Sequence, residues 1–532
     1  MSNKKAYQEF SIIDEFASDE ESAVVSKKIT KIKTIELVGL DGVAVDVEVH
    51  MTRGRCRFSI IGLPDTALQD AMYRVSTALK TTSYGFDFNK NITVNLAPAD
   101  LAKDGPSYDM PIAIGVLLAQ QKRELLLDDT AFVGELSLDG NFRPVRGILA
   151  LVDCARALGF RRIFIPATQT VDVRIIDGIE IYGVQTISQL YQFLIGECEL
   201  TPLIPQPIIV SATSDDAYDL AYIKGQEQAQ RALEGAIAGG HNILFAGPPG
   251  SGKTLLAKTA MSLMPTIQHA HALEIAKIHS LVSTYESSAS RVFTRPFRSP
   301  HHSSSQASLI GGGRVPRPGE VSLAHRGILF LDELPEFSRA LLEALRQPLE
   351  DGVVTIARVA STIKFPCRAL VIGAYNPCPC GYYGDGVKSC SCTDYVRARY
   401  MSKLSGPLLD RFDIHLRVPR MSYDEMRDAQ GRGESSAVVR ARIEVARDIA
   451  RQRLSKYGIT TNAEMDARCI KEFCALDEQT QSLMSQAASR YVLSGRAISR
   501  IQKIARTIAD LAGSEAILAD HVLEALRYKV SS

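Results

Sequence analysis

The sequence predicts an α/β protein built from several domains, and three observations support this fold class. The chain has 532 residues, about three to four times a typical domain of ~150 residues, so several hydrophobic cores are expected. Hydrophobic residues make up 45% and charged residues 23%, which is typical of globular proteins and excludes a mostly disordered, collagen-like or coiled-coil chain. Short apolar runs alternate with segments of helical period, as in a mostly parallel sheet covered by helices.

Composition also limits the classes of function and location. The formal net charge is +1, so any affinity for nucleic acid must come from local basic patches rather than from the whole chain. The longest apolar stretches, such as residues 111–119, are far shorter than the ~18 to 20 residues of a membrane span. The N-terminus is polar rather than signal-like, and the ten cysteines do not form a disulfide framework in so long a chain. We therefore expect a cytoplasmic protein with reduced cysteines.

Composition and periodicity divide the chain into five segments. Residues 1–28 contain clustered acidic side chains and no clear period, which predicts a flexible acidic tail. Residues 29–200 show the patterns of a compact α+β domain, and residues 201–219, with three prolines and a Ser/Thr/Asp cluster, predict a linker. Residues 220–425 alternate strand-like and helical segments, which indicates a mostly parallel sheet, and residues 426–532 are helical.

Individual helices and strands follow from local patterns. Apolar residues recur at helical spacing over residues 68–79, and apolar and polar residues alternate over residues 92–96, as in a half-buried strand. Asp520 is placed to cap a last helix over residues 521–528. The other predicted elements are a helix over 147–158, strands over 163–165, 242–246, 328–331 and 369–375, and a helix around 501–508.

The strongest motif is the segment 247–254, Gly-Pro-Pro-Gly-Ser-Gly-Lys-Thr. It has the spacing G-x-x-x-x-G-K-T, follows a predicted strand and opens a predicted helix, which is the context of a phosphate-binding loop. The glycines let backbone N–H groups surround the phosphates of ATP, Lys253 neutralises the β- and γ-phosphate charge, and the Thr254 hydroxyl is placed to bind Mg²⁺. The residues expected to bind ATP are Gly247, Pro248, Pro249, Gly250, Ser251, Gly252, Lys253 and Thr254.

Two further predicted strands end in polar residues that complete a nucleotide-hydrolysis site. One ends in Asp332 and Glu333, the arrangement of a metal-holding aspartate and a water-polarising glutamate beside a phosphate-binding loop. The next ends in Asn376, at the carboxyl edge where open α/β sheets bind ligands. We expect Asp332 and Thr254 to bind Mg²⁺, Glu333 to activate the attacking water, and Asn376 to orient that water.

Four of the ten cysteines form two close pairs, Cys378 with Cys380 and Cys390 with Cys392. Nine residues that include three glycines separate the pairs, so a flexible loop can bring the four thiolates together. This pattern predicts a tetrahedral zinc site in a reducing compartment. One residue rather than the more usual two lies within each pair, so free or redox-active thiols stay open as the alternative.

Beyond these motifs, the chain resembles a known family. It resembles AAA+ ATPases of the branch that contains magnesium-chelatase subunits and MCM helicases, and within it the ComM/YifB group of magnesium chelatase-like proteins. The resemblance covers nearly the whole chain beyond the tail and implies a Lon-protease-like α+β domain, an AAA+ P-loop α/β domain and a C-terminal helical lid. It is carried by the motifs above and by the segments Gly62–Asp65, Pro106–Pro111, Arg295–His302, Asn376–Gly381 and Leu408–Asp413.

The resemblance also assigns two arginines. Arg411 matches the arginine finger that a subunit offers to its neighbour's nucleotide, and Arg496 matches the sensor-2 arginine of the helical lid, with Arg500 as the alternative to Arg496. A guanidinium group on the γ-phosphate stabilises the charge of the transition state, and one supplied by a neighbour makes hydrolysis depend on oligomerisation. The other interpretation of each arginine is a surface or salt-bridging side chain.

Two long windows without acidic residues, 287–319 and 352–384, are candidates for contact with DNA. The resemblance places them at the helix-2 insert and at the hairpin before sensor 1, which line the ring pore in related helicases. Basic pore loops suit tracking along phosphates without base readout, and packing against acidic neighbouring subunits is the alternative. The candidate residues are Arg298, Arg358 and Lys364.

The Lon-like domain carries one half of a protease motif. Ser107 lies where Lon proteases have their nucleophilic serine, and the resemblance places Leu149 where the Lon pattern has its catalytic lysine. A serine needs a base to activate it. The resemblance therefore implies a proteolytically inactive domain that serves assembly or contact with a substrate.

Together these inferences predict an ATP-dependent hexameric DNA motor. By resemblance it would be a branch-migration helicase that acts on recombination intermediates, as the family does in natural transformation, or competence. Its cofactors would be ATP and Mg²⁺, with zinc at the cysteines, and its partners single-stranded or branched DNA and further copies of the same chain. The alternative is a chelatase-like AAA+ protein remodeller that does not act on DNA, whereas Leu149 disfavours an ATP-dependent protease.

Overall fold

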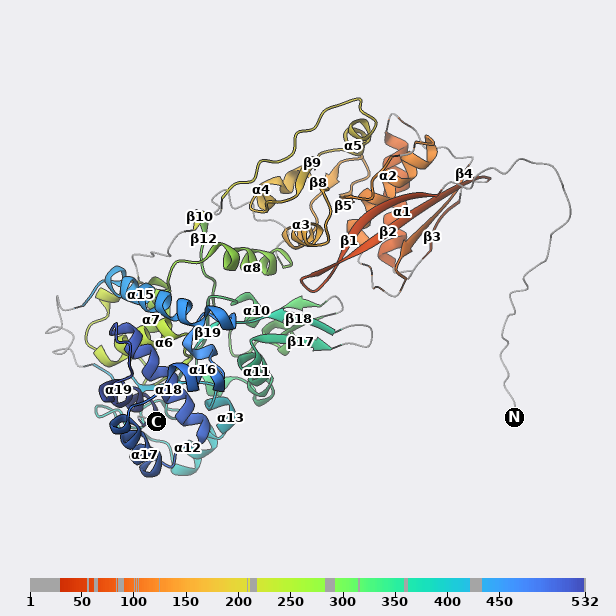
Figure 1. Ribbon diagram of the computed structural model, residues 1–532. Coiled ribbons are helices and arrows are strands. Elements are labelled where there is room, and N and C mark those ends of the chain that lie inside the picture. Colours follow the sequence, from red (N-terminus) through yellow and green to blue (C-terminus); the bar gives the residue numbers. More distant parts are fainter. Residues whose placement is uncertain are drawn as a thin grey trace, which may run out of the picture.

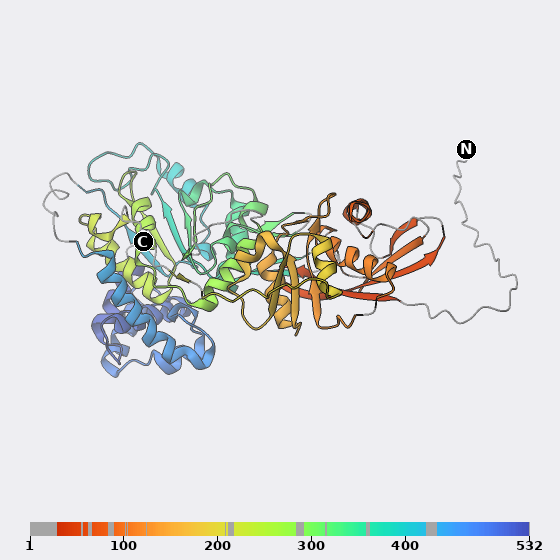
Figure 2. The same cartoon turned by 90° about the horizontal axis from the view of Figure 1, so that it is seen from above.

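The structure, a computed structural model, comprises an N-terminal α/β domain, a central domain around a parallel sheet, and a C-terminal helical bundle (Figure 1). In Figure 2 the N-terminal domain projects to one side of the other two parts. The expected acidic tail, residues 1–28, and the expected boundary between residues 425 and 426 lie outside the described residues. The described residues are 29–54, 57–61, 66–82, 84, 90–99, 101, 103, 105–123, 125–207, 209–210, 218–282, 292–313, 316–357, 362–421 and 433–530.

The N-terminal domain is built on a seven-stranded mixed sheet. Its strands are β1 (Thr30–Val38), β2 (Asp41–Arg53), β3 (Arg57–Ile61), β4 (Lys90–Ala97), β5 (Thr130–Phe132), β8 (Arg162–Pro166) and β9 (Glu180–Val184), and a separate hairpin joins β6 (Glu135–Leu136) and β7 (Phe142–Arg143). The spatial order is β3-β4-β2-β1-β5-β8-β9. β2 pairs antiparallel with β1 and β4, and the other pairs are parallel. The alternation predicted for residues 92–96 is confirmed, because Ile92, Val94 and Leu96 are buried.

Helices cover both faces of this sheet. They are α1 (Thr66–Thr81), α2 (Asp109–Gln120), α3 (Ile148–Ala157), α4 (Thr170–Val173) and α5 (Ile187–Leu194), with short 3-10 turns η1 (Gly105–Tyr108) and η2 (Ala167–Gln169). α2 is apolar around its whole circumference, so it is buried between β1 and β2 on one side and α1 and α5 on the others. α1 and α3 confirm the two helices that the apolar spacing predicts.

The central domain is organised around a five-stranded sheet. Its strands are β11 (Ile243–Ala246), β13 (Phe297–Arg298), β16 (Ile328–Leu331), β19 (Leu370–Tyr375) and β20 (Ile414–Arg417), in the order β13-β16-β19-β11-β20. All four strand pairs are parallel. Helices cover the sheet on both faces, which explains why β16 is the unbroken apolar run Ile-Leu-Phe-Leu. The carboxyl ends of the strands therefore meet at one edge, where such sheets bind ligands.

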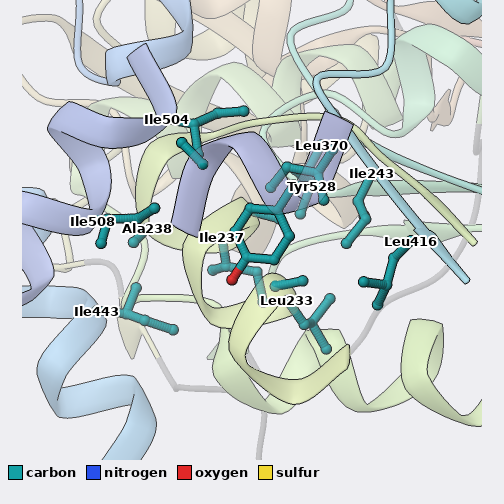
Figure 3. Close-up of a cluster of buried hydrophobic side chains, with 14 of the residues drawn as sticks. Leu233, Ile237, Ala238, Ile243, Leu370, Leu416, Ile443, Ile504, Ile508 and Tyr528 are labelled. Carbon is teal, nitrogen blue, oxygen red and sulfur yellow. The ribbon is translucent and has the colours of Figure 1, made fainter. Parts of the chain in front are cut away.

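The C-terminal bundle shares one hydrophobic core with the helices of the central domain. The central helices are α6 (Glu227–Gly239), α7 (Lys253–Leu263), α8 (His269–Ser280), α9 (Gln306–Leu309), α10 (Glu320–Leu323), α11 (Arg339–Asp351), α12 (Asp394–Met401) and α13 (Gly406–Leu409). The bundle helices are α15 (Ser436–Leu454), α16 (Ala467–Phe473), α17 (Glu478–Arg490), α18 (Gly495–Leu511) and α19 (Ala519–Val530). Figure 3 shows Ile237 of α6, Ile443 of α15 and Ile508 of α18 within this cluster. No helix in these ranges has the length and apolarity that a membrane crossing requires.

Two sequence predictions need correction or refinement. Asp520 does not cap the last helix, because α19 already begins at Ala519 and Asp520 lies in its first turn. There the carboxylate still favours the helix dipole, while the imidazole of His521 accepts a hydrogen bond from the Leu518 N–H at 3.1 Å. Within the expected linker, β10 (Ile209–Val210) pairs in parallel with β12 (Val292–Phe293).

Helix α8 joins the N-terminal domain to the central domain. Its buried Ala272 belongs to the same hydrophobic cluster as the residues of α3. Lys277 of α8 forms an ion pair of 2.6 Å with Asp153 of α3, and the N–H of Gly147 donates to the Ser280 carbonyl at 2.9 Å. The two domains therefore share a packed interface along α3 and α8.

A second contact joins the same two domains. The strands β17 (Val353–Ala357) and β18 (Thr362–Pro366) form an antiparallel hairpin on the side of the central domain that faces the N-terminal domain (Figure 1). Gly39, in the turn between β1 and β2, has a φ of +74°, and a Cβ atom there would lie 2.8 Å from Cγ2 of Ile363. The β1–β2 turn therefore packs directly on the hairpin. In the central domain, two further short strands, β14 (Gly311–Gly312) and β15 (Arg317–Pro318), pair antiparallel with each other.

We predict that Ala272→Asp loosens the N-terminal domain from the central domain. Ala272 is fully buried among apolar side chains, and a carboxylate without a partner in such a place costs about 2 kcal/mol or more. The variant should show a lower Tm and faster protease cleavage within residues 201–219. Ala270→Asp is the matched control, because Ala270 lies on the same helix but is exposed. Equal cleavage rates for the two variants would contradict the packed interface.

Candidate functional site

The phosphate-binding motif forms a loop between β11 and α7, at the carboxyl edge of the parallel sheet. Gly250 and Gly252 have φ values of +77° and +91°, which residues with side chains rarely adopt, so the curvature of the loop requires glycine there. Gly247 is required for lack of space, because a Cβ atom would lie 2.2 Å from the Val418 carbonyl oxygen. The loop leads into the N-terminus of α7, where N–H groups and the helix dipole favour phosphate.

The ammonium group of Lys253 is buried and held by oxygen atoms. It donates to the carbonyl oxygens of Gly247 at 2.8 Å and Pro248 at 2.9 Å, and to Oδ1 of Asn376 at 3.2 Å. Burial lowers the pKa of Lys253, and the two carboxylates that follow β16 oppose this shift. The positive charge therefore lies inside the loop, next to the residue that ends β19.

Thr254 and Asp332 meet at the same edge. Oγ1 of Thr254 donates to Oδ2 of Asp332 at 3.0 Å. Hydroxyl and carboxylate oxygens are the ligands that Mg²⁺ takes beside nucleotide phosphates. The two residues therefore fit the Mg²⁺ site expected from the sequence.

Glu333 follows Asp332 in an uncommon backbone conformation. Its φ is +50°, and its N–H donates to Oδ1 of Asp332 at 2.9 Å. The carboxylate is 53% exposed and lies 3.5 Å from Nδ1 of His302. Non-glycine residues with positive φ cluster at functional sites, and an exposed carboxylate at this position can accept a proton from water.

Four cysteine sulfurs come together directly after Asn376. The Sγ atoms of the four predicted ligands lie within 4.8 Å of one another, with Cys378 Sγ 3.3 Å from Cys380 Sγ and 3.6 Å from Cys390 Sγ. Four sulfurs at Zn–S distances of ~2.3 Å in a tetrahedron are ~3.8 Å apart. The cluster therefore fits a tetrahedral zinc ion.

The cysteine loop packs against the phosphate-binding loop. Gly381 has a φ of +84°, and a Cβ atom there would lie 2.5 Å from Cδ of Pro249. Arg420 links the two loops, because its guanidinium donates to the Pro249 carbonyl at 3.2 Å and lies 3.9 Å from a carboxylate oxygen of Asp385. The position of the phosphate-binding loop thus depends on the fold of the cysteine loop.

Arg411 lies at the opposite edge of the sheet. Its carbonyl accepts a hydrogen bond of 3.0 Å from Nδ2 of Asn242, which precedes β11, whereas the phosphate-binding loop follows β11. A strand of four residues spans ~13 Å. The guanidinium group pairs with Glu350. Arg411 is therefore remote from the phosphate-binding loop of its own chain, which is compatible with an arginine offered to a neighbour.

The two candidate lid arginines have different surroundings. Arg496 is exposed in the first turn of α18 and makes no hydrogen bond or ion pair within the described ranges. Arg500 is only 14% exposed and lies 3.6 Å from Asp410 and 3.4 Å from Asp413. Because ion pairs hold Arg500 in place, Arg496 is the better match for an arginine that contacts nucleotide, and this role stays a prediction.

The three candidates for DNA contact also differ. Arg298 donates to both carboxylate oxygens of Glu320, at 2.6 and 2.7 Å, so its charge is already neutralised within the chain. Lys364 on β18 is exposed, and its ammonium group has no partner among the residues that the structure describes. Arg358 lies outside the described residues. Lys364 is therefore the candidate that presents an unmatched positive charge.

In the N-terminal domain, Ser107 lies in η1 and is half-buried. Leu149 lies in the first turn of α3 and packs into the core of the domain, with 7% of its surface exposed. A leucine cannot accept a proton from a serine hydroxyl. The position expected for a catalytic lysine thus contributes packing instead.

Two residues of the site are not evident from the sequence. His302 lies beside Glu333, although the sequence showed it only as one member of the segment Arg295–His302. Arg420 contacts a loop 171 positions earlier in the chain, and no local pattern distinguishes it from a surface arginine. Long-range pairing of this kind becomes visible only in the folded chain.

We predict that Gly381→Ala weakens nucleotide binding. The new methyl group would push Pro249, and the left-handed backbone would be strained, which costs about 1 to 3 kcal/mol and displaces the phosphate-binding loop. Titration with a fluorescent ATP analogue should show a Kd raised by about tenfold. Gly386→Ala is the matched control in the same loop, because nothing lies within 4 Å of a Cβ atom there. Equal Kd values for both variants would contradict the coupling of the loops.

Three family models match successive parts of the chain. The model described as subunit ChlI of Mg-chelatase matches residues 47–169. The model described as magnesium chelatase, subunit ChlI, matches residues 219–426, which include the whole phosphate-binding site. The model for the C-terminal part of the same subunit matches residues 433–529.

Similarity to whole proteins extends over nearly the full chain. Competence protein ComM of Haemophilus influenzae is 40% identical over 496 residues, 92% of this chain and 96% of that protein. The uncharacterized protein YifB of Escherichia coli is 40% identical over 499 residues, 94% of this chain and 96% of that protein. Lon protease 2 of Bacillus subtilis is 26% identical over 166 residues, 28% of this chain and 30% of that protein. On this identity and coverage, the chain belongs to the ComM/YifB family of magnesium chelatase-like AAA+ proteins.

Proposed function

We propose that this protein is an ATP-driven DNA motor that assembles as a homohexameric ring and acts on branched recombination intermediates. The observation that carries the proposal is the division of the site between two edges of one sheet. Lys253, Thr254 and Asp332 lie at the carboxyl edge, and Arg411 lies at the amino edge. A site divided in this way is completed by a second copy of the chain. The relative named as a competence protein supports a role in competence.

ATP binding would use the loop N–H groups and Lys253. The phosphate oxygens would replace the neutral oxygens that the ammonium group contacts in this structure, because a hydrogen bond between two charged groups is the stronger one. Thr254 and Asp332 would hold Mg²⁺, which neutralises phosphate charge when bound. The burial of Lys253 strengthens its attraction to the phosphates, since little water screens it.

Hydrolysis would use residues from two subunits. Glu333 is placed to take a proton from the attacking water, and Asn376 lies close enough to Lys253 to position that water beside the phosphates. Arg411 of a neighbouring subunit would leave Glu350 and bind the γ-phosphate, where its charge stabilises the transition state. ATP turnover would therefore require the assembled ring.

DNA contact would involve the β17–β18 hairpin. Lys364 is exposed on β18, within a window of the sequence that contains no acidic residue. A lysine without an acidic partner attracts backbone phosphates regardless of base sequence, and each such contact releases a counterion. The proposal therefore includes ATP turnover that DNA stimulates and salt suppresses.

We predict that ATP turnover rises with a three-stranded DNA junction, that ATP drives branch migration of this junction, and that stimulation falls steeply between about 50 and 200 mM salt. Glu333→Gln should still bind ATP and lose about 100-fold or more in turnover. Lys364→Ala should reduce stimulation by DNA. Lys471→Ala, which removes an exposed lysine of α16 in the helical bundle, should keep it.

The same assay separates the motor from a chelatase-like protein remodeller. ATP turnover that no form of DNA changes, together with an unprocessed junction, would overturn the motor and favour the remodeller. Normal turnover by Glu333→Gln would overturn the assignment of the hydrolytic site itself.

We propose a structural zinc ion at Cys378, Cys380, Cys390 and Cys392. Four sulfurs within 4.8 Å of one another support this proposal, and the packing of Gly381 on Pro249 indicates that the metal would hold the cysteine loop against the nucleotide site. The free or redox-active thiols considered from the sequence are the competing interpretation.

We predict about one zinc per chain by metal analysis of the purified protein. Replacing Cys378 and Cys390 together by serine should remove the metal and weaken ATP binding, because the loop against Pro249 would lose its anchor. Cys198→Ser, at a cysteine of the N-terminal domain, is the control and should keep both. A metal-free protein that binds ATP normally would contradict the proposal.

We also propose that the N-terminal domain has no peptidase activity. The buried Leu149 supports this proposal, since it occupies the position of the expected base.

A further inference from the structure

A cavity lies at the amino ends of the parallel strands, on the edge of the sheet away from the phosphate-binding loop. Its volume is about 440 Å³, within the ~300 to 1,000 Å³ of small-molecule sites. On the sheet side it is lined by Asn242, Gly327 and Ala369, which precede three of the strands. On the bundle side it is lined by α15 and by residues 459–464. The central domain and the bundle therefore enclose it together.

This arginine cavity, as we call it, is lined by seven arginines and five acidic residues. Most of these charges are neutralised by ion pairs. Four of the five acidic residues take part in these ion pairs, and the remaining one, Asp351, is exposed to solvent. The pairs are Arg368 with Glu464, Arg411 with Glu350, Arg500 with Asp410 and Asp413, Arg326 with Glu274, and Arg451 with Asp448.

Two arginines of the cavity have no carboxylate partner among the described residues. Arg295 donates to the carbonyl oxygens of Pro265 at 2.9 Å and Arg326 at 2.5 Å. Arg447 donates to the Ile237 carbonyl at 3.0 and 2.5 Å. Carbonyl oxygens accept hydrogen bonds but do not neutralise a charge, so these two guanidinium groups are positive charges without a carboxylate beside them.

Burial, together with the charge of neighbouring arginines, lowers the pKa of Arg295 to about 9 and that of Arg447 to about 10. Both guanidinium groups are still charged at neutral pH. An anion in the cavity would relieve the repulsion and restore the pKa of each group toward its ordinary value.

We propose that the arginine cavity binds a small phosphoanion, either inorganic pyrophosphate or the phosphate chain of a nucleotide. Each guanidinium group has N–H donors that the carbonyls do not use, and paired N–H donors match two phosphate oxygens. Arg451 also lines the cavity, is half exposed and pairs with Asp448, which does not line the cavity. The cavity has room for a di- or triphosphate and is too small for a nucleic acid duplex. Lys253 takes no part in this site, whereas Arg411, proposed above to contact a neighbouring subunit's nucleotide, also lines the cavity.

The test uses the full chain carrying Lys253→Ala, which disables the phosphate-binding loop. Calorimetric titration with pyrophosphate, ATP and AMP should show one site that binds the first two and not AMP, if the phosphate chain is recognised. Binding of ATP without pyrophosphate would identify the nucleotide as the source. Arg447→Gln in the same background should weaken binding by about tenfold or more.

A control variant separates the site from general surface charge. Arg440 lies on the same helix as Arg447 and also donates to a backbone carbonyl, that of Ser262 at 3.2 Å, but does not line the cavity. Arg440→Gln should bind pyrophosphate normally. If Arg447→Gln does not fold, Arg451→Gln provides the test, because its half-exposed side chain can be removed with little effect on folding. Absence of binding in the Lys253→Ala chain, or equal binding by all variants, would overturn the proposal.

Discussion

The buried ammonium group of Lys253 is the interaction on which the rest of the nucleotide site depends. A charge at this depth is costly unless several partners surround it. Four oxygens do so, three from the loop after β11 and one from Asn376 after β19. β11 and β19 are neighbours in the sheet, so the pairing of these two strands fixes the distance between the partners. β16 flanks β19 on its other side and brings Asp332 into the same group. The site is therefore set by the order of the strands before any ligand is considered.

The parallel sheet also explains why positive groups occur at both of its edges. Positive potential is concentrated at the carboxyl edge, where β11, β16 and β19 terminate. It comes from the loop N–H groups, the N-terminus of α7 and Lys253. At the amino edge the described residues form no such loop, and the positive groups are arginines from segments that precede the strands and from the helical bundle. Ion pairs neutralise most of them, Arg500 with Asp413 among others. The two edges thus differ in kind: one is built by backbone geometry, the other by side chains from distant segments.

What the sequence could predict follows from how local each feature is. The loop 247–254 and the strands before Asp332 and Asn376 are short continuous patterns, and the structure confirms them within a residue. The four cysteines are close in sequence, so their convergence was also predictable. The contact of Arg420 with Pro249 was not predictable, because it depends on the pairing of β20 with β11, which local sequence does not show. The cap predicted at Asp520 was wrong, because α19 begins at Ala519, two residues before the predicted start. The imidazole of His521 accepts a hydrogen bond from the Leu518 N–H instead, an alternative that composition alone does not reveal.

The packing of the β1–β2 turn on the β17–β18 hairpin has a consequence for motion. The turn touches Ile363, one residue before Lys364. Helix α8 of the central domain also holds the N-terminal domain, through the ion pair between Lys277 of α8 and Asp153 of α3. The hairpin is thus supported from outside by a domain that has its own hydrophobic core. A tilt of β18 would have to move that domain with it or open the contact at Gly39. The turn of Gly39 and Leu40 therefore couples the position of the hairpin to that of the N-terminal domain.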